Sequence, residues 1–352
     1  MEYKTLNEIA TNFRYGRMPD KGKLTDSGIY PVWSGYRYVG YYNEKNINKD
    51  EIVVVARGVG GTGDVKICKE DCFLTNLSIA FNVNEDINPL YVYYYYQIKN
   101  LRYLDSGSAQ SQITINDLKN VKIPVPSKII QDKIVEVLNK LDQKIELNNE
   151  INNNLHEISK QLLLKYLDEN SNSEEINISE LLNVFTGKKN ANETSPTGKY
   201  KFFSCAPDSL LSDTYLYDGA AIIVAGNGAY TGRTRFYDGK FELYQRTYGL
   251  ILKEGLDKNN IYGLYVFMKN VFEPDKMGGT HGSAIPYIVL SDLTDYKLRY
   301  NKDEFDKFSN LVSSNIKMIQ KNEKFNEQLS QLRDTLLPKL MNGEIDLDNI
   351  EI

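Results

Sequence analysis

Residues 107–126 read GSAQSQITINDLKNVKIPVP, and the order of segments in this stretch decides the fold. A small polar head is followed by a short alternating segment, which closes on Pro124-Val125-Pro126 directly before a long helical pattern. We expect the head to form a loop and ITINDL to form the closing strand of a domain. The prolines should straighten the exit into the helix, because proline disfavours helix in the residue before it.

The same order of segments returns about 170 residues later, which is the signature of an internal repeat. DEIVVVARGVGGTGDV (50–65) matches DGAAIIVAGNGAYTGRT (218–234), and ITINDLKNVKIPVP (113–126) matches IPYIVLSDLTDYKLRY (285–300). The second copy lacks the prolines and has Leu298-Arg299-Tyr300 instead. Two equivalent halves in one chain predict a pseudo-two-fold arrangement.

Each half ends in a long helical pattern, at 129–167 and at 303–341. Apolar residues follow a four-three spacing, which is typical of a coiled-coil or bundle seam. Both patterns far exceed the average helix of about 11–12 residues, so we favour two rigid spacers packed antiparallel over helices that each cross their own domain. Asn148, Asn152 and Ser159 should then lie on or beside the seam, where polar residues fix register.

The rest of each half mixes strands and helices. A short helix (about 4–11; about 178–185) should precede a Tyr-rich sheet segment, the strand with its glycine loop, a further strand (73–83; 241–252) and a helix (88–99; 260–270). This mixture predicts an α+β fold with two tandem mixed α/β domains and the two long helices as an antiparallel coiled coil. Pro338 should kink or end the second helix.

Composition limits the possible classes of protein. With 352 residues, 41% hydrophobic and 25% charged, the chain fits a soluble globular protein of two domains. A net charge of −5 does not by itself indicate a nucleic-acid binder. The N-terminal segment lacks the pattern of a signal peptide, no apolar run is long enough for a membrane helix, and three cysteines imply no disulfide framework. We therefore expect a cytoplasmic location.

Several short stretches imitate catalytic or metal-binding motifs. GVGGTGD (58–64) lacks the lysine of a phosphate loop, and Asn88-Pro89-Leu90-Tyr91 has one proline too few for a methyltransferase loop. Pro274-Asp275 with Asp295-x-Lys297 fits a nuclease pattern that also occurs by chance, and Cys68-x3-Cys72 has no partner pair to complete a zinc site. We interpret these stretches as structural or accidental, with no metal site and no catalytic residue.

Polar loops on the repeated scaffold carry the remaining signal. Their side chains are of the types that bind base edges and phosphates, although for any one of them an ordinary solvated loop position is the simpler interpretation. The candidate DNA-binding residues are Arg14, Arg17, Trp33, Tyr36, Arg57, Gln110 and Gln112 in the first half, and Lys188, Lys189, Asn227, Tyr230, Arg233, Arg246 and His281 in the second.

These features together resemble the specificity subunit of type I restriction–modification systems. SGSAQSQITINDLKNVKIPVP (106–126), LNKLDQKIELNNE (138–150) and LSQLRDTLLPKLMNGEI (329–345) carry the resemblance, which covers nearly the whole chain. It implies two target-recognition domains, at 1–126 and 176–301, joined to spacer helices at 127–168 and 302–345 through a linker at 169–175, with a tail at 346–352. Each domain would bind one half of a bipartite site in double-stranded DNA.

The resemblance also implies partners and a division of labour. The chain would do no chemistry and hold no cofactor, while two modification subunits would use S-adenosylmethionine and restriction subunits would use ATP and Mg²⁺. The helix positions expected to face partners are Leu138, Leu141, Ile145, Leu155, Leu162, Leu311, Ile319, Leu329 and Leu336. The alternatives are a self-sufficient nuclease or methyltransferase and a coiled-coil scaffold without a DNA role.

Overall fold

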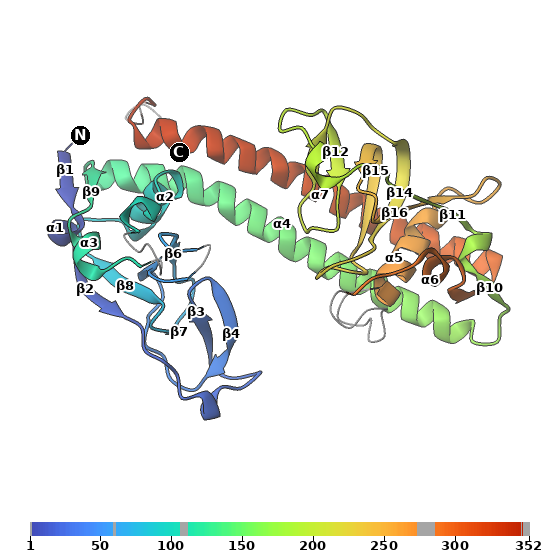
Figure 1. Ribbon diagram of the computed structural model, residues 1–352, viewed down its shortest axis with the longest axis horizontal. Coiled ribbons are helices and arrows are strands. Elements are labelled where there is room, and N and C mark those ends of the chain that lie inside the picture. The colour runs from blue at the N-terminus through green and yellow to red at the C-terminus, as the bar shows by residue number, and fades with distance from the viewer. Residues whose placement is uncertain (1, 59–60, 106–111, 273–285, 346, 348–352) are drawn as a thin grey trace. The chain divides into compact units, whose positions relative to one another are not determined.

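The computed structural model describes residues 2–58, 61–105, 112–272, 286–345 and 347. The chain divides into two compact units, each built from a globular part and a portion of both long helices. Unit 1 comprises Met1–Ile145 with Glu327–Ile352, and unit 2 comprises Glu146–Asn326. The long helices are α4 (Lys128–Glu169) and α7 (Lys302–Met341), and they pack together (Figure 1).

The described residues of unit 1 form three small sheets. β1 (Glu2–Thr5) pairs antiparallel with β9 (Lys122–Val125). A four-stranded sheet has the order β2 (Ala10–Tyr15), β8 (Ser78–Val83), β5 (Ile52–Val55) and β6 (Val65–Ile67), and a three-stranded sheet the order β4 (Arg37–Tyr42), β3 (Tyr30–Ser34) and β7 (Phe73–Leu74). The helices are α1 (Leu6–Ile9), α2 (Pro89–Ile98) and α3 (Ile115–Lys119), with short 3₁₀ turns η1 (Lys21–Lys23) and η2 (Arg102–Leu104).

Helix α2 supplies the centre of the unit 1 core. Its proline at the first position and the Asn88 side chain, which accepts a hydrogen bond from the Leu90 amide, start the helix. Tyr91 and Tyr94 are buried in one cluster with strands β5 and β8, with Leu138 of α4 and with Leu337 of α7. The tyrosine run of α2 therefore serves packing, as its predicted helical position indicates.

Unit 2 is organised around a single larger sheet. Its order is β11 (Leu182–Thr186), β16 (Thr247–Leu252), β14 (Tyr217–Ala225), β15 (Thr234–Leu243), β12 (Tyr200–Phe203) and β13 (Leu210–Ser212). β10 (Glu175–Asn177) and β17 (Lys297–Arg299) form a separate antiparallel pair. The helices are α5 (Asn260–Phe272) and α6 (Leu290–Thr294), with the 3₁₀ turns η3 (Ile178–Glu180) and η4 (Ala191–Glu193), and α5 packs on β14, β15 and β16 (Figure 1).

Polar side chains pair α4 with α7 in unit 2. Asn148 donates to Asn326 over 2.7 Å, Asn322 donates to Asn152 over 2.8 Å, and Asn315 donates to Ser159 over 3.2 Å. Partner numbers fall on α7 as they rise on α4, so the helices run antiparallel, as the sequence predicts. A shift of 174 residues carries Asn148 onto Asn322 and Asn152 onto Asn326, so two of these pairs are copies of each other. The predicted polar seam and its two-fold character are confirmed here.

The segment ITINDL is a helix start rather than the closing strand that the alternating pattern suggested. The Thr114 hydroxyl accepts from the Asp117 amide, and the Asp117 carboxylate accepts from the Thr114 amide, a reciprocal cap that begins α3. The closing strand is β9, and Pro124 lies in it opposite Tyr3. Proline fits this place because β9 has a neighbour on one side only.

Four other predicted elements have different bounds in the structure, for local reasons. The helices expected at about 4–11 and 178–185 shrink to α1 and η3, because the flanking residues join sheets as β1, β2, β10 and β11. The strands expected at 73–83 and 241–252 are each two strands separated by a turn. Pro338 lies inside α7, three residues before its end at Met341, so the helix continues briefly past the proline.

Candidate nucleic-acid interface

A glycine loop follows the central strand of each main sheet, and the two loops close in the same way. In unit 1 the Val55 amide donates to the Asp64 carbonyl over 2.9 Å and the Gly63 amide donates back to Val55 over 2.9 Å. In unit 2 the Ala225 amide donates to Arg233 over 3.0 Å and the Gly232 amide donates back to Ala225 over 2.8 Å. The repeat found in the sequence is therefore also a repeat of backbone geometry.

A second segment crosses each loop at its first residues. The Ile113 amide donates to the Ala56 carbonyl over 2.9 Å, and the Ile288 amide donates to the Gly226 carbonyl over 2.8 Å. These bonds sit beside isolated bridges that pair Arg57 with Gln112 and Asn227 with Tyr287. By this register the structural counterpart of Arg57 is Asn227, a relation that the sequence alignment of the loops did not reveal.

Gly63 shows why the first loop requires glycine. Its φ is +90°, and a Cβ atom there would lie 2.5 Å from the backbone nitrogen of Arg102. Both the left-handed backbone and the contact with η2 exclude a side chain. Glycine at this position therefore lets the loop backbone pack directly against the backbone of η2.

In unit 1 the guanidinium of Arg57 lies over the ring of Tyr15, 5.9 Å from the ring centroid. The Arg57 Nε atom is buried and has no hydrogen-bond partner among the described residues. The backbone amide of Gln112 donates to the Asp105 carboxylate over 2.9 Å, and the Gln112 side chain takes no part in this bond. Tyr15 belongs to this group but was not predicted from the sequence, because it lies 42 positions before Arg57 in the chain.

Arg14 and Arg17 are held by carboxylates of their own unit. Arg14 forms an ion pair with Glu51 at 2.6 Å and donates to the Asn46 carbonyl, and Glu51 is only 3% exposed. Arg17 is paired with Glu44 at 2.5 Å on a more exposed surface. Arg14 therefore has a structural partner inside the fold, whereas the Arg17 pair is open to solvent and to competition from phosphate.

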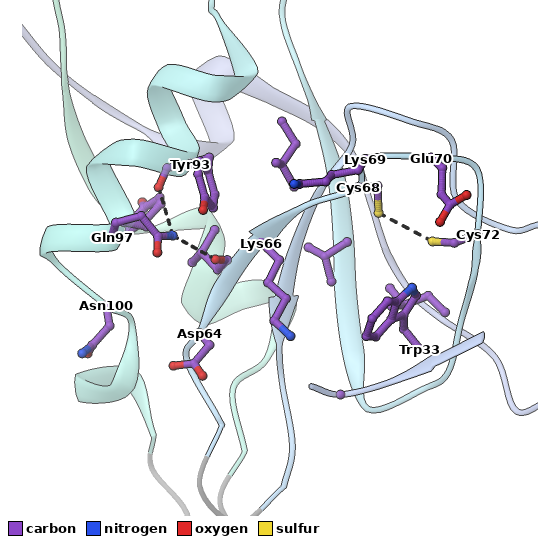
Figure 2. A pocket seen from close by; sticks show the side chains of 16 residues that line it. Trp33, Asp64, Lys66, Cys68, Lys69, Glu70, Cys72, Tyr93, Gln97 and Asn100 are labelled. Atoms are coloured by element: carbon purple, nitrogen blue, oxygen red, sulfur yellow. Dashed lines mark hydrogen bonds between the residues drawn. The ribbon is translucent and has the colours of Figure 1, made fainter. Parts of the chain in front are cut away.

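Trp33 and Tyr36 differ in accessibility. Trp33 is half-buried in β3 and lines a cavity of about 700 Å³ beside Lys66 and Cys68 (Figure 2). Tyr36 is 41% exposed in the turn after β3, and its hydroxyl accepts from Arg37 over 3.1 Å. Of the two aromatic rings, Tyr36 offers the larger free surface for stacking on a base.

In unit 2 the loop brings Arg233 and Tyr230 together. The Arg233 guanidinium lies 4.4 Å from the Tyr230 ring centroid, and Tyr230 is 39% exposed. A planar cation stacked on an exposed ring presents hydrogen-bond donors at its edge, as bidentate contact with guanine requires. Asn227 uses its Oδ1 to accept from the Cys205 thiol over 3.0 Å.

The three other candidates of unit 2 that the structure describes fall into two groups. Lys188 and Arg246 are exposed. Lys189 is directed inward, where it donates to Thr214 over 2.6 Å and lies 3.5 Å from the buried carboxylate of Glu242. Lys188 and Arg246 are thus the free cations of this group. Gln110, His281 and the Pro274-Asp275 pair of the nuclease-like pattern lie outside the described residues.

Comparison with known proteins assigns the chain to a family. A family model described as the type I restriction modification DNA specificity domain matches residues 1–157 and 170–331. The chain belongs to this family. It is 30% identical over 175 residues to the type I restriction enzyme EcoDI specificity subunit of Escherichia coli, a match that spans 48% of this chain and 38% of that subunit.

Two further similarities cover more of this family member. The type I restriction enzyme MjaIX specificity subunit of Methanocaldococcus jannaschii is 23% identical over 302 residues, which are 74% of this chain and 70% of that one. The crystal structure of the type I restriction-modification system S subunit from M. genitalium has a TM-score of 0.66 at 20% identity, covering 96% of this chain and 95% of that one. The specificity-subunit fold expected from the sequence, two mixed β-sheet domains with two packed helices, is confirmed.

The helix positions predicted to face partners mostly point into this family member's own core. Leu138 in unit 1 and Ile319 in unit 2 are buried in their clusters, and Leu329 is 8% exposed. Leu155, Leu162 and Leu336 pack partly buried against the same clusters, and Leu141 and Ile145 are half-buried. Leu311 is the exception, at 61% exposed.

Leu311 is one of three large apolar side chains of α7 in unit 2 that are exposed at regular spacing. Leu311, Met318 and Phe325 are spaced seven residues apart and are 61%, 46% and 43% exposed. Seven-residue spacing places them along one side of the helix, about 10.5 Å apart along its axis. We call these three residues the α7 stripe.

Two further properties of the described residues concern membranes and metal ions. No described helix combines the length and the apolar character needed to span a membrane. Within the same residues, histidine, cysteine, aspartate and glutamate side chains form no group of three or more that could hold a metal ion.

Proposed function

We propose that each globular part binds one half of a bipartite DNA target, and that the α4–α7 pair sets the distance between the two halves. The observation that carries the proposal is the duplicated glycine loop with its crossing segment, which presents Arg57 in one unit and Asn227 with Arg233 in the other. Arginine pairs with guanine and asparagine with adenine, so the two copies carry different side chains of the classes that discriminate bases.

The proposed partners follow from the exposed surface of α7. The α7 stripe leaves three large apolar side chains in solvent on one side of a helix, which is the pattern of helix-to-helix docking. We propose that this surface receives a helix of a methyltransferase subunit, one of two in the complex. Those subunits would supply S-adenosylmethionine and adenine methylation, and restriction subunits would supply ATP- and Mg²⁺-dependent translocation and cleavage.

A domain exchange tests the bipartite proposal. Residues 1–125 are replaced by those of a relative with another target, in the complex with the modification partner, and methylated sites are mapped by sequencing. The expected result is a new first half-site with the second half-site and the spacing unchanged. A change in both half-sites, or in neither, would contradict the modular assignment.

Single substitutions separate base recognition from phosphate binding. Arg233→Ala should weaken binding of the cognate site by about 1–3 kcal/mol and relax one base position. Lys188→Ala serves as the matched control, because an exposed lysine that contacts phosphate should lower affinity about equally for all sequences. If Arg233→Ala also lowered affinity uniformly, its role would be phosphate binding.

Incubation of the purified chain with DNA, Mg²⁺ and S-adenosylmethionine addresses the enzymatic alternative. The proposal expects turnover only when the modification partner is added, and turnover by the chain alone would refute it. Gel shifts with that partner present address the scaffold alternative, which predicts no DNA binding at all.

A further inference from the structure

Cys68 and Cys72 bring their thiols together at one wall of the unit 1 cavity. The two Sγ atoms lie 3.6 Å apart and face each other (Figure 2). We propose that this pair is a redox site, at which hydrogen peroxide converts the two thiols to an intramolecular disulfide that a dithiol reductant reverses. The inference goes beyond the proposed function, and its chemistry does not depend on DNA binding.

The backbone holds both cysteines in place. They occupy the two ends of the turn from β6 to β7, and each end is bonded to the preceding segment 46–51. The Cys68 amide donates to Glu51 over 3.0 Å, and the Cys72 amide donates to Ile47 over 3.1 Å. A disulfide needs the sulfurs to approach to about 2.05 Å, a closure of roughly 1.5 Å that side-chain rotation can supply.

The two thiols are unequal as acids. The hydrogen bond between the two thiols lowers the pKa of Cys72, whereas the same contact together with burial raises the pKa of Cys68. Burial and the charges of Glu70, Glu51 and Asp71 oppose ionisation of Cys72, but the pKa of Cys72 remains below its usual value. Because this contact favours ionisation of Cys72 over Cys68, we assign Cys72 as the nucleophile and Cys68 as the thiol that resolves the product.

The cavity supplies access to an otherwise buried nucleophile. Cys72 is only 2% exposed, but it lines the cavity of about 700 Å³ together with Cys68, Trp33 and Lys66 (Figure 2). A space of this size admits a molecule as small as hydrogen peroxide. A bulky oxidant such as glutathione disulfide would have to bring its own disulfide bond to a sulfur at the inner wall of the cavity. We therefore propose hydrogen peroxide as the oxidant.

The proposed reaction has two balanced steps. The Cys72 thiolate attacks one peroxide oxygen, the O–O bond breaks, and the leaving hydroxide takes up the proton released from Cys72 and becomes water. The resulting sulfenic acid is attacked by the Cys68 sulfur, an S–S bond forms, and the sulfenic hydroxyl leaves with the Cys68 proton as a second water. Two thiols are oxidised by two electrons and one peroxide is reduced to two waters.

Trp33 makes the reaction directly observable. It is the single tryptophan of the chain, and it packs, as Cys68 does, against the small buried cluster that contains Cys72. β7 begins at the residue after Cys72 and pairs in parallel with the strand of Trp33. Closure of the disulfide should therefore quench or shift the intrinsic fluorescence of Trp33.

The experiment treats the full-length protein with hydrogen peroxide and digests it with trypsin without reduction. Cleavage after Lys69 separates Cys68 from Cys72, so the two peptides stay joined only through a disulfide. We expect the joined peptide, two hydrogen masses lighter than the separate peptides together, with a parallel change in Trp33 fluorescence, both reversed by dithiothreitol. Cys205→Ser should behave like the unaltered protein, because Cys205 lies in unit 2.

Two variants show whether the pair acts as assigned. Cys68→Ser should lose the fluorescence change and accumulate a sulfenic acid at Cys72, which dimedone traps when it is added together with urea to unfold the oxidised protein. Cys72→Ser should give neither product. Circular dichroism of both variants before oxidation checks that they fold. Oxidation of either cysteine to sulfinic acid without a joined peptide in the unaltered protein would overturn the proposal, as would a disulfide that forms only through Cys205.

Discussion

The asparagine pairs between α4 and α7 provide a sharp test of how the two helices are held in register. Asn148 is 2% exposed, and its amide donates to Asn326 over 2.7 Å. Asn148→Ala removes this bond and leaves the Asn326 oxygen without that donor in a half-buried place. A hydrogen bond contributes about 0.5–1.5 kcal/mol net, and an unsatisfied partner costs about 1–3 kcal/mol. We therefore expect a loss of about 1–2 kcal/mol.

Amide hydrogen exchange measured by mass spectrometry reports this loss locally. Peptides from α4 and α7 around the substitution should exchange about 5–30-fold faster, the factor that corresponds to 1–2 kcal/mol. Asn154→Ala is the control, because Asn154 is exposed on the same helix and its replacement should change stability by less than about 0.5 kcal/mol. Similar exchange rates in the two variants would show that the Asn148–Asn326 hydrogen bond does not stabilise the helix pair.

A double-mutant cycle then isolates the pair. Asn326→Ala and the combined variant complete the cycle with Asn148→Ala, and contacting residues should show a coupling of about 0.5–3 kcal/mol. Replacement of both asparagines by leucine should be close to neutral or stabilising, because the Asn149 oxygen that accepts from Asn326 is exposed and can bond to water instead. That variant should retain the helices but define their register less strictly. A coupling near zero would mean that the two amides do not depend on each other.

Three further predictions concern other parts of the fold. Burial and Lys269 lower the pKa of His156 from 6.5 to about 4, so neutral His156 contributes at most about 3 kcal/mol to the free energy of unfolding. This contribution is present above pH 6.5 and is lost as the pH falls through 4, so His156→Leu should make stability, measured by urea unfolding, depend less on pH in this acid range. Asp142→Ala should lower the stability of unit 1 by about 2 kcal/mol, because Asp142 accepts from the buried Tyr94 hydroxyl and from Arg333, each over 2.8 Å. Thermal unfolding of Asp142→Ala and Asp142→Asn, compared side by side, separates the effect of the charge from that of hydrogen bonding. Gly63→Ala should cost more than about 3 kcal/mol, since the added Cβ would meet backbone atoms, and unchanged thermal unfolding would contradict that contact.

Much of the architecture could be predicted because its signals are periodic and local. The long helices follow from a four-three apolar spacing sustained over many turns, and the repeat follows from copies of the same segments at a constant shift. The polar seam follows from the same periodicity, since Asn148, Asn152 and Ser159 fall on the stripe that the apolar residues define. The family resemblance rests on the same segments, and the family model confirms it.

Local competition explains the errors in the expected elements. ITINDL alternates like a strand, but the reciprocal bonds between Thr114 and Asp117 begin a helix, and Lys122–Val125 takes the strand position instead. A short alternating run does not distinguish the two outcomes, because the energy of one cap is comparable to the strand preference of a few residues.

The sequence by itself determined the two-fold plan, the long helices and the family, because all three depend on patterns that repeat along the chain. Only the tertiary structure decided which polar side chains remain available for a ligand. It pairs Arg14 with the buried Glu51, places Arg57 over Tyr15 and Arg233 over Tyr230, and sets Cys68 against Cys72. Two of these pairings, Arg14 with Glu51 and Arg57 with Tyr15, join residues far apart in the chain and depend on strand register and on burial, which no local pattern encodes.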